Sequence, residues 1–208
     1  MGNATDFQQI PTTTLCDVMP NRAQVMTHEI RPLWSGMPRL AGPAYTVRCG
    51  PGDNLMLHAA IYRAPRGSVI VVESADCDYA VAGGNVCAVA QAHGIVGFVI
   101  DGVIRDLPEI RDLAFAVFAR GVVPIPGGKS ALDLLNQPVS CGGVRVSPGD
   151  IVVADENGVV VVPAALADDV LMKSQARLVR DAEITLAQWE ADHKSRIDQI
   201  LSSKGFKS

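Results

Sequence analysis

The run at residues 68–73, Ser-Val-Ile-Val-Val-Glu, is the segment that most restricts how this chain can fold. Its consecutive β-branched residues predict a strand that is apolar on both faces, and such strands lie inside a sheet that is covered on both sides. Apolar runs at residues 96–100 and 115–119 predict two further strands. Mixed with helical segments, these runs predict an α/β sandwich.

The two ends of the chain differ from this middle. Residues 12–19 predict a short first helix, and residues 139–163 read as a series of short β elements with a hairpin turn at Asn157-Gly158. Residues 164–204 contain no glycine or proline and carry apolar side chains at helical spacing, which predicts one long helix or two helices. One small domain cannot cover the whole apolar face of such a segment, so we expect part of it to pack on another subunit or on the sheet.

Composition narrows the functional classes. The chain has 208 residues, enough for one domain or at most two small ones, and its net charge of −4 without a basic stripe argues against nucleic acid as a partner. Neither a signal-peptide pattern nor an apolar run near the length of a membrane span is visible. The five cysteines include no C-x-x-C pair and fit buried thiols in a reducing compartment. We therefore expect a cytoplasmic protein with neither nucleic acid nor membrane as partner.

The candidate chemistry begins at a pair of glycines. Gly83 and Gly84 break the chain before a predicted helix over residues 86–92, which is composed of small apolar helix formers. Free N–H groups at a helix N-terminus favour an anion. The amides of Gly84, Asn85 and Val86 are therefore candidate anion donors.

Three charged residues follow the predicted strand at 96–100, whose end Asp101-Gly102 marks. Arg105 offers a fixed positive fork suited to a carboxylate or an enolate oxygen. Asp106 and Glu109 supply hard oxygen ligands suited to Mg²⁺ or Mn²⁺. The same acids also fit a helix start, with Asp106 as the N-cap and Glu109 at the third position, so metal binding and capping are both open.

These residues carry a family resemblance. Gly84, then twenty residues, then Arg105-Asp106, two residues and Glu109 resemble the G-X20-R-D-X2-E/D signature of the RraA-like family, which holds the regulator of ribonuclease activity A and the class II 4-hydroxy-4-methyl-2-oxoglutarate aldolases. Two further segments extend the likeness: residues 51–58, Pro-Gly-Asp-Asn-Leu-Met-Leu-His, and residues 147–163. The likeness runs from about residue 13 to about residue 183.

The resemblance implies a fold and an assembly. It implies a single domain over residues 1–208 with an α-β-β-α layered sandwich, swivelling-domain-like, and a helical C-terminal extension. It also implies a homotrimer or homohexamer with sites at subunit interfaces, in which residues 163–208 pack on a neighbouring subunit.

In the aldolases of this family, a divalent metal chelates the carboxylate and keto oxygens of a pyruvyl group. By resemblance, Asp106 would bind the metal, Arg105 would donate to the keto oxygen and stabilise the enolate, and the amides of Gly84, Asn85 and Val86 would hold the substrate carboxylate. Such preorganised charge is a large term in catalysis.

One position departs from many aldolases of the family, which have an aspartate where this chain has Gly84. That aspartate holds metal-bound water, and Glu109 is expected to take over this role here. The family also draws an acid from the neighbouring subunit's C-terminal helix. Glu183 is the first candidate for that acid and Asp181 the second, although both also fit solvated helix charges.

Two functions of different classes follow. One is a class II aldolase dependent on Mg²⁺, Mn²⁺ or another divalent metal, which cleaves 4-hydroxy-2-oxo acids such as 4-hydroxy-4-methyl-2-oxoglutarate to pyruvate and decarboxylates oxaloacetate. The alternative is a non-catalytic protein-binding regulator resembling the inhibitor of ribonuclease E. Arg105 beside Asp106 and Glu109 favours the enzyme, because regulation alone needs no metal-ready group. A phosphohistidine carrier is a weaker reading, since His93 lacks a supporting motif.

Two other features have ordinary explanations. A lone histidine on a helix, such as His58, is more often structural than a ligand contact. Gly128-Lys129-Ser130 resembles the end of a phosphate-binding loop, but Val123 stands where that motif requires its first glycine.

Overall fold

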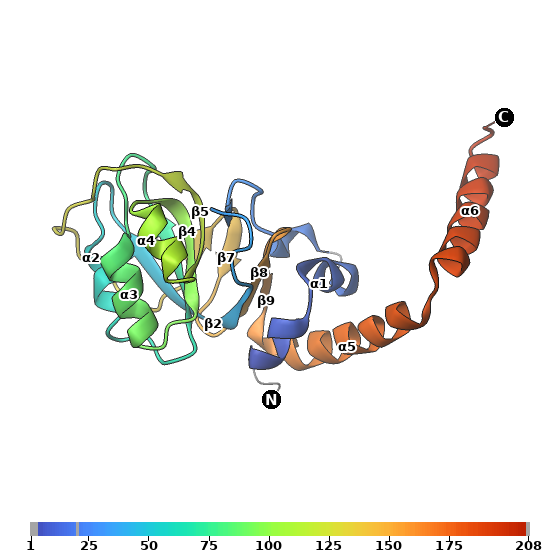
Figure 1. Cartoon of the computed structure of the whole chain (residues 1–208), viewed down its shortest axis with the longest axis horizontal. Coiled ribbons are helices and arrows are strands. Elements are labelled where there is room, and N and C mark those ends of the chain that lie inside the picture. Colours follow the sequence, from blue (N-terminus) through green and yellow to red (C-terminus); the bar gives the residue numbers. More distant parts are fainter. Residues whose placement is uncertain (1–3, 20, 207–208) are drawn as a thin grey trace.

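The computed structural model describes residues 4–19 and 21–206, which form a curved mixed sheet with helices on both sides (Figure 1). Seven strands are ordered β1-β5-β4-β3-β2-β8-β9, and β6 and β7 form a separate hairpin. The strands are β1 Arg31–Pro32, β2 Leu40–Cys49, β3 Val69–Ser74, β4 Gly97–Ile104, β5 Ala116–Val122, β6 Val139–Cys141, β7 Val144–Val146, β8 Ile151–Asp155 and β9 Gly158–Val162. The helices are η1 Ala4–Gln9, α1 Thr12–Val18, η2 Arg22–Gln24, α2 Leu55–Ala60, α3 Gly84–Ala92, α4 Leu107–Asp112, η3 Ala164–Leu166, α5 Ala167–Glu183 and α6 Leu186–Ser203.

Three apolar cores separate four layers. Side chains of α2, α3 and α4 pack on one face of β3, β4 and β5, where Ile70, Phe98 and Val117 are fully buried. The other face of these strands packs against β8 and β9 through residues such as Val71. The outer face of β8 and β9 is covered by η1, α1 and the start of α5. The predicted α-β-β-α sandwich is therefore confirmed.

The strand predicted to be internal is confirmed as such. β3 lies between β2 and β4 and is parallel to both. Every residue of its Val69–Val72 run is fully buried, because helices cover one face and the second half of the sheet covers the other. Small residues on α3, such as Cys87 and Ala90, allow the helix to approach this sheet closely.

β2 joins the two halves of the sheet. Its first residues pair antiparallel with β8 as far as Pro43, and from Ala44 onward it pairs parallel with β3. A proline has no N–H to donate to a sheet ladder. Pro43 lies where β2 changes its partner strand from β8 to β3. The N–H that it lacks would therefore belong to a ladder that is interrupted at this point in any case.

The predicted end of the second strand is wrong. β4 continues through Asp101-Gly102 to Ile104, with a shift of register against β5 between Ile100 and Val103. Gly102 marks a close approach here, because a Cβ on it would lie 2.7 Å from the Cβ of Ser74. A glycine within a strand often marks a bulge or a place where another segment approaches closely.

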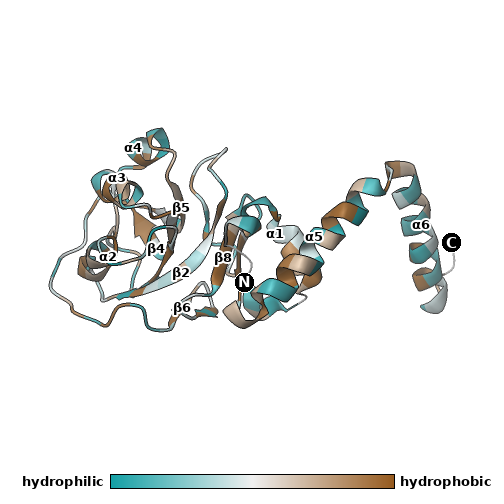
Figure 2. Ribbon diagram, turned by 90° about the horizontal axis from the view of Figure 1, so that it is seen from below, coloured by the Kyte–Doolittle hydropathy of each residue, from teal (hydrophilic) through white to brown (hydrophobic). Residues whose placement is uncertain are grey.

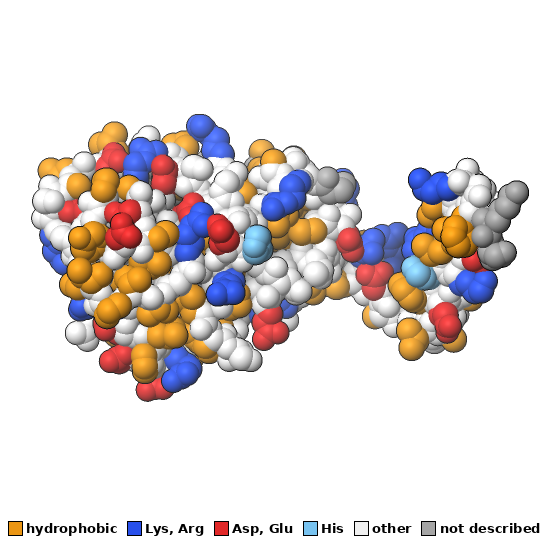
Figure 3. Space-filling model, turned by 90° about the horizontal axis from the view of Figure 1, so that it is seen from above, with side chains coloured by type: hydrophobic (Ala, Val, Ile, Leu, Met, Phe, Trp, Pro, Cys, Tyr) orange, Lys and Arg blue, Asp and Glu red, His pale blue; other side chains and the backbone are white. Residues whose placement is uncertain are grey.

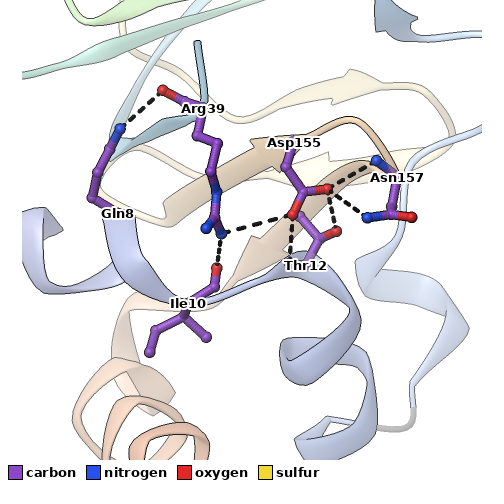
Figure 4. Close-up of polar contacts among 6 residues, drawn as sticks. All are labelled: Gln8, Ile10, Thr12, Arg39, Asp155 and Asn157. Carbon is purple, nitrogen blue, oxygen red and sulfur yellow. Dashed lines mark hydrogen bonds and ion pairs between the residues drawn. The ribbon is translucent and has the colours of Figure 1, made fainter. Parts of the chain in front are cut away.

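A buried carboxylate fixes the N-terminal helices to β8 (Figure 4). Asp155 accepts hydrogen bonds from Thr12 N (2.9 Å) and Thr12 Oγ1 (2.7 Å), and Asn157 N also donates to it. Arg39 Nη2 lies 3.7 Å from the same carboxylate. Burial raises the pKa of Asp155, but the hydrogen bonds from Thr12 and Asn157 outweigh it and leave the pKa below its ordinary value.

The C-terminal segment forms two helices. α5 packs on α1 through Val170 and Leu171, whereas α6 stands away from the body of the chain (Figures 1 and 2). Thr185 begins α6 with a capping box that pairs it with Gln188. None of the described residues of α6 is buried, and the exposed apolar side chains include Leu186. Among the helices of residues 4–19 and 21–206, none has the length and apolar character needed to cross a membrane.

Candidate active site

The site forms at the carboxyl ends of the parallel strands. Residues 80–82 run between the end of β4 and the loop after β5, where Arg105 N donates to Ala82 O (3.0 Å) and Gly127 N donates to Ala80 O (3.0 Å). These bonds draw the chain before α3, the chain before α4 and the loop after β5 to one edge of the sheet. Ligands of open α/β sheets commonly bind at this edge.

The two glycines allow these segments to meet. A Cβ on Gly83 would lie 2.5 Å from Asp106 Oδ2, and a Cβ on Gly84 would lie 2.9 Å from the Cβ of Glu109. Neither position has room for a side chain beside the chain that begins α4. Glu109 therefore occupies the space that an aspartate side chain at position 84 would need. The glycine at position 84 and the glutamate at position 109 are thus linked by packing.

Asp106 has an unusual backbone. Its φ of 57° and ψ of 43° lie in the left-handed region, which costs energy for a residue other than glycine and often marks a functional site. Its side chain does not cap α4; instead, Oδ2 accepts from Gly84 N (3.1 Å) and lies 3.4 Å from Arg105 Nε. Asp106 is therefore the N-cap residue of α4 by position, as the capping alternative predicts, but its side chain makes no capping hydrogen bond. Its Oδ1 has no hydrogen-bond partner among the residues that the structure describes.

The predicted row of amides is only partly available. The N–H of Gly84 points at Asp106 and is not open to a ligand, which differs from the expectation that it would hold a substrate carboxylate. Asn85 and Val86 line the cavity described below. Within the described chain, their N–H groups have no backbone acceptor outside α3, as expected for the first turn of a helix.

A small cavity opens at this corner, with a volume of about 100 Å³. A water molecule occupies roughly 30 Å³ in the liquid, so the space suits a ligand of a few heavy atoms better than a large cofactor. The cavity is lined by Asn54, His58, Ala80, Ala82, Gly83, Asn85, Val86, Arg105, Asp106, Pro126 and Lys129. A wider hollow of about 500 Å³ lies on the other side of Asp106 and includes Glu109 and Asp112.

Two cavity residues, His58 and Lys129, were not predicted as site residues. Burial lowers the pKa of His58 and the charge of Lys129 lowers it further, which favours the neutral imidazole at pH 7. The residue in the sequence that could have pointed to Lys129 is Asp53, which holds the loop that carries Lys129 through hydrogen bonds. Asp53 is buried and accepts from the N–H groups of Ser130 and Ala131.

The acids at this corner suit a magnesium-like ion. The described residues contain no group of three or more His, Cys, Asp or Glu side chains that could hold a metal. Mg²⁺ is commonly held by one or two carboxylates, with waters and substrate oxygens as the remaining ligands. Asp106, with one unpaired carboxylate oxygen, and the exposed Glu109 therefore fit such an ion better than zinc, which usually takes three or four protein ligands.

Glu183 does not join the site within one chain. It is the last residue of α5 and is exposed, and it lines neither the cavity nor the wider hollow. The end of α5 points away from α3 and α4 (Figure 1). His93 lies at the far end of α3 from the cavity, where its ring meets that of Tyr62 edge to face at 5.2 Å.

Comparisons with known proteins agree with this architecture. The sequence model of the RraA-like family, described as Aldolase/RraA, matches residues 12–161. A relative from Halalkalibacterium halodurans, named "Putative 4-hydroxy-4-methyl-2-oxoglutarate aldolase", is 36% identical over 203 residues, which is 97% of this chain and 92% of that protein.

Solved structures show the same likeness. The crystal structure of Streptomyces coelicolor RraAS2, an unusual member of the RNase ES inhibitor RraA family, has a TM-score of 0.73 and 26% identity, covering 93% of this chain and 96% of that one. The structure of the RNA-processing inhibitor RraA from Thermus thermophilus has a TM-score of 0.67 and 27% identity, covering 74% of this chain and 93% of that one. With its sheet, its glycine pair and its Arg-Asp corner, the chain belongs to the RraA-like family.

Proposed function

We propose that this protein is a divalent-metal-dependent aldolase that cleaves 4-hydroxy-2-oxo acids to pyruvate and also decarboxylates oxaloacetate. The observation that carries the proposal is the corner where Arg105 and the left-handed Asp106 meet the N-terminus of α3 on a small cavity. The aldolase name of a relative that matches 97% of the chain supports it. No specific observation favours the non-catalytic regulator.

The residues divide the chemistry between them. Asp106 and Glu109 would hold a divalent metal, which supplies a Lewis acid for the 2-oxo group. The N–H groups of Asn85 and Val86 bind the substrate carboxylate at the helix N-terminus. Arg105 donates to the 2-oxo oxygen and stabilises the negative charge that develops on it.

Retro-aldol cleavage then breaks the C3–C4 bond. The C4 hydroxyl loses its proton as C4 becomes a carbonyl, and the bonding electrons move to C3 and form the pyruvate enolate. Glu109, which lines the wider hollow next to Asp106, accepts the proton through water, and protonation of C3 completes pyruvate. In oxaloacetate, C4 is a carboxylate that leaves as CO₂. Its loss yields the same enolate, and no proton has to be removed from a hydroxyl at C4.

We also propose that α6 packs on a second copy of this chain in a homotrimer or homohexamer, and that this brings Glu183 to a neighbouring site. Figure 3 shows α6 as a separate lobe with hydrophobic side chains on its surface. Leu186 is 80% exposed and Trp189 51% exposed. Most of the stability of a helix in a protein comes from packing of its apolar face, so such a helix needs a partner surface. Light scattering should report an oligomer, and a chain truncated after Glu183 should form a smaller species; a monomeric full chain would contradict this.

Activity can be tested with oxaloacetate and 4-hydroxy-4-methyl-2-oxoglutarate, with Mg²⁺ or with chelator. Arg105→Ala should lower kcat about 100- to 1,000-fold, the usual cost of removing one such donor. Arg111→Ala is the matched control, because Arg111 is an exposed arginine on α4, six residues after Arg105, and lines neither hollow. Absence of metal-dependent pyruvate release from the wild type would refute the proposed function.

A further inference from the structure

We propose that Asn54 positions the water molecule that takes the proton from the C4 hydroxyl during retro-aldol cleavage. The inference rests on the proposed function, because it assigns a positioning residue to one step of that reaction. The observation that carries it is a buried side-chain oxygen in the wall of the cavity, which has no hydrogen-bond partner among the described residues.

Asn54 stands at the start of α2 and is 4% exposed. Asparagine is a preferred N-cap residue, yet the side chain of Asn54 makes no capping hydrogen bond. Its N–H donates to Gly128 O (2.9 Å), its backbone O accepts from His58 N (3.2 Å), and its Nδ2 donates to Gly127 O (3.2 Å). Oδ1, by contrast, is buried without a partner in the part of the chain that the structure describes. Such buried acceptors are uncommon in folded proteins, and each calls for an explanation.

The hydrogen bond with Gly127 fixes which end of the amide is free. If the oxygen and nitrogen of the Asn54 amide were exchanged, its oxygen would face Gly127 O, and two acceptors would meet. Gly127 is itself held in place, since its N–H donates to Ala80 O (3.0 Å). The free end of the amide is therefore an acceptor, which needs a donor from a ligand or a water molecule.

A water molecule is the donor that suits the reaction. At pH 7 the keto form of a 4-hydroxy-2-oxo acid has a single hydrogen-bond donor, the C4 hydroxyl, and cleavage requires that hydrogen to leave as a proton. A neutral amide oxygen is a poor proton acceptor, whereas water can relay a proton. A water that donates one hydrogen to Asn54 Oδ1 keeps a lone pair for the C4 hydroxyl and a second hydrogen for transfer.

The walls of the site leave a route from this water to Glu109. Asn85 and Asp106 line both the small cavity, which Asn54 also lines, and the wider hollow, which Glu109 lines. The two spaces therefore adjoin at these residues. As the C3–C4 bond breaks, the C4 hydroxyl gives its proton to the water, and the water passes its second hydrogen as a proton toward Glu109. Water is re-formed, with its other hydrogen still bonded to Asn54.

A comparison of two substrates tests this role, because decarboxylation of oxaloacetate removes no proton from a C4 hydroxyl. Asn54→Leu removes the acceptor at similar volume. It should lower kcat for 4-hydroxy-4-methyl-2-oxoglutarate at least about tenfold more than kcat for oxaloacetate, as expected for impaired proton transfer. Asn54→Asp keeps an acceptor oxygen and should preserve more of the ratio of the two activities than Asn54→Leu.

Asn21→Leu is the matched control. Asn21 is also an N-cap asparagine, but its side chain accepts from Ala23 N (3.0 Å), and it is exposed and does not line the cavity. This variant should leave the ratio at the wild-type value. Because both activities are measured on one preparation, a fraction of unfolded variant does not alter the ratio.

A crystal structure of the full-length protein with Mg²⁺ and pyruvate gives a second readout that needs no turnover. It should show a water within hydrogen-bond distance of Asn54 Oδ1, and a structure without one would overturn the inference. Equal losses of both activities in Asn54→Leu would also overturn it, since Asn54 would then have a structural role, while the aldolase would stand. Absence of pyruvate release from either substrate by the wild type would overturn the proposed function and the proton relay with it.

Discussion

Asp155 and Asp106 are both aspartates that accept a backbone N–H from a distant segment, yet their surroundings differ. The side chain of Asp155 is 9% exposed and is surrounded by donors from Thr12 and Asn157 (Figure 4). That of Asp106 is 37% exposed, on a left-handed backbone, with one amide bond and a loose approach to Arg105. The carboxylate of Asp155 is fully engaged in hydrogen bonds that stabilise the fold. The carboxylate of Asp106 is positioned by its contacts but can still bind a ligand.

The largest expected effect concerns Asp106. Asp106→Asn should reduce kcat/KM for oxaloacetate by at least about 100-fold, because a neutral amide is a poor ligand for a hard divalent cation. Its free energy of unfolding should change little, since the carboxylate is partly exposed and makes few bonds. Urea unfolding beside the activity assay checks both parts. Asp78→Asn, at an exposed loop position, serves as the control; a stability loss as large as that of Asp155→Asn would break the comparison.

Asp155→Asn should show the opposite pattern. Loss of a charged acceptor with several donors should reduce the free energy of unfolding by about 2 kcal/mol, while kcat/KM under folding conditions stays near the wild-type value. Glu156→Gln, at the exposed next residue, is the matched control. Unaltered stability in urea would show that the N-terminal helices are held by their apolar contacts alone.

The same residue gives a pH dependence. The pKa of Asp155 is lower in the folded chain than its ordinary value of 3.8. Its contribution to stability is therefore complete above the unfolded-state pKa and is lost as the pH falls through the folded-state pKa. Acid unfolding curves of wild type and Asp155→Asn should converge below pH 4; parallel curves throughout the acid range would contradict the linkage.

A smaller effect tests the packing that supports Asp106. Gly84→Ala places a Cβ 2.9 Å from the Cβ of Glu109 and should destabilise the chain by roughly 1–2 kcal/mol through overpacking. In a Glu109→Gly background the atom that it meets is absent, so the cost of Gly84→Ala should shrink, and a double-mutant cycle in urea measures this. Gly121→Ala is the control, since its nearest neighbour would be 3.9 Å away. Additive costs would show that the two positions are independent.

The sequence predicted those features that depend on local pattern. Four consecutive β-branched residues gave the internal strand β3, and the small residues after Gly84 gave α3. Arg105, Asp106 and Glu109 were placed correctly between β4 and the first turn of α4. These features need only neighbouring residues, which is why they are visible in one chain.

The remaining features depend on contacts between distant segments. The extension of β4 past Gly102 follows from the packing of that glycine against Ser74, which the sequence does not show. The left-handed backbone of Asp106 accompanies its bond with Gly84, which lies 22 residues away. Lys129 reaches the cavity because Asp53, 77 residues from Ser130, clamps its loop.

The most direct test of the account is metal binding by Asp106 itself. Mn²⁺ binding to the full-length protein should be followed by electron paramagnetic resonance in the presence of pyruvate, for wild type, Asp106→Asn and Asp155→Asn. We predict one ion per chain for wild type and Asp155→Asn, and an affinity at least about tenfold weaker for Asp106→Asn, as expected for the loss of a charged ligand. Equal Mn²⁺ affinity in wild type and Asp106→Asn would contradict the account, because Asp106 would then not be a metal ligand.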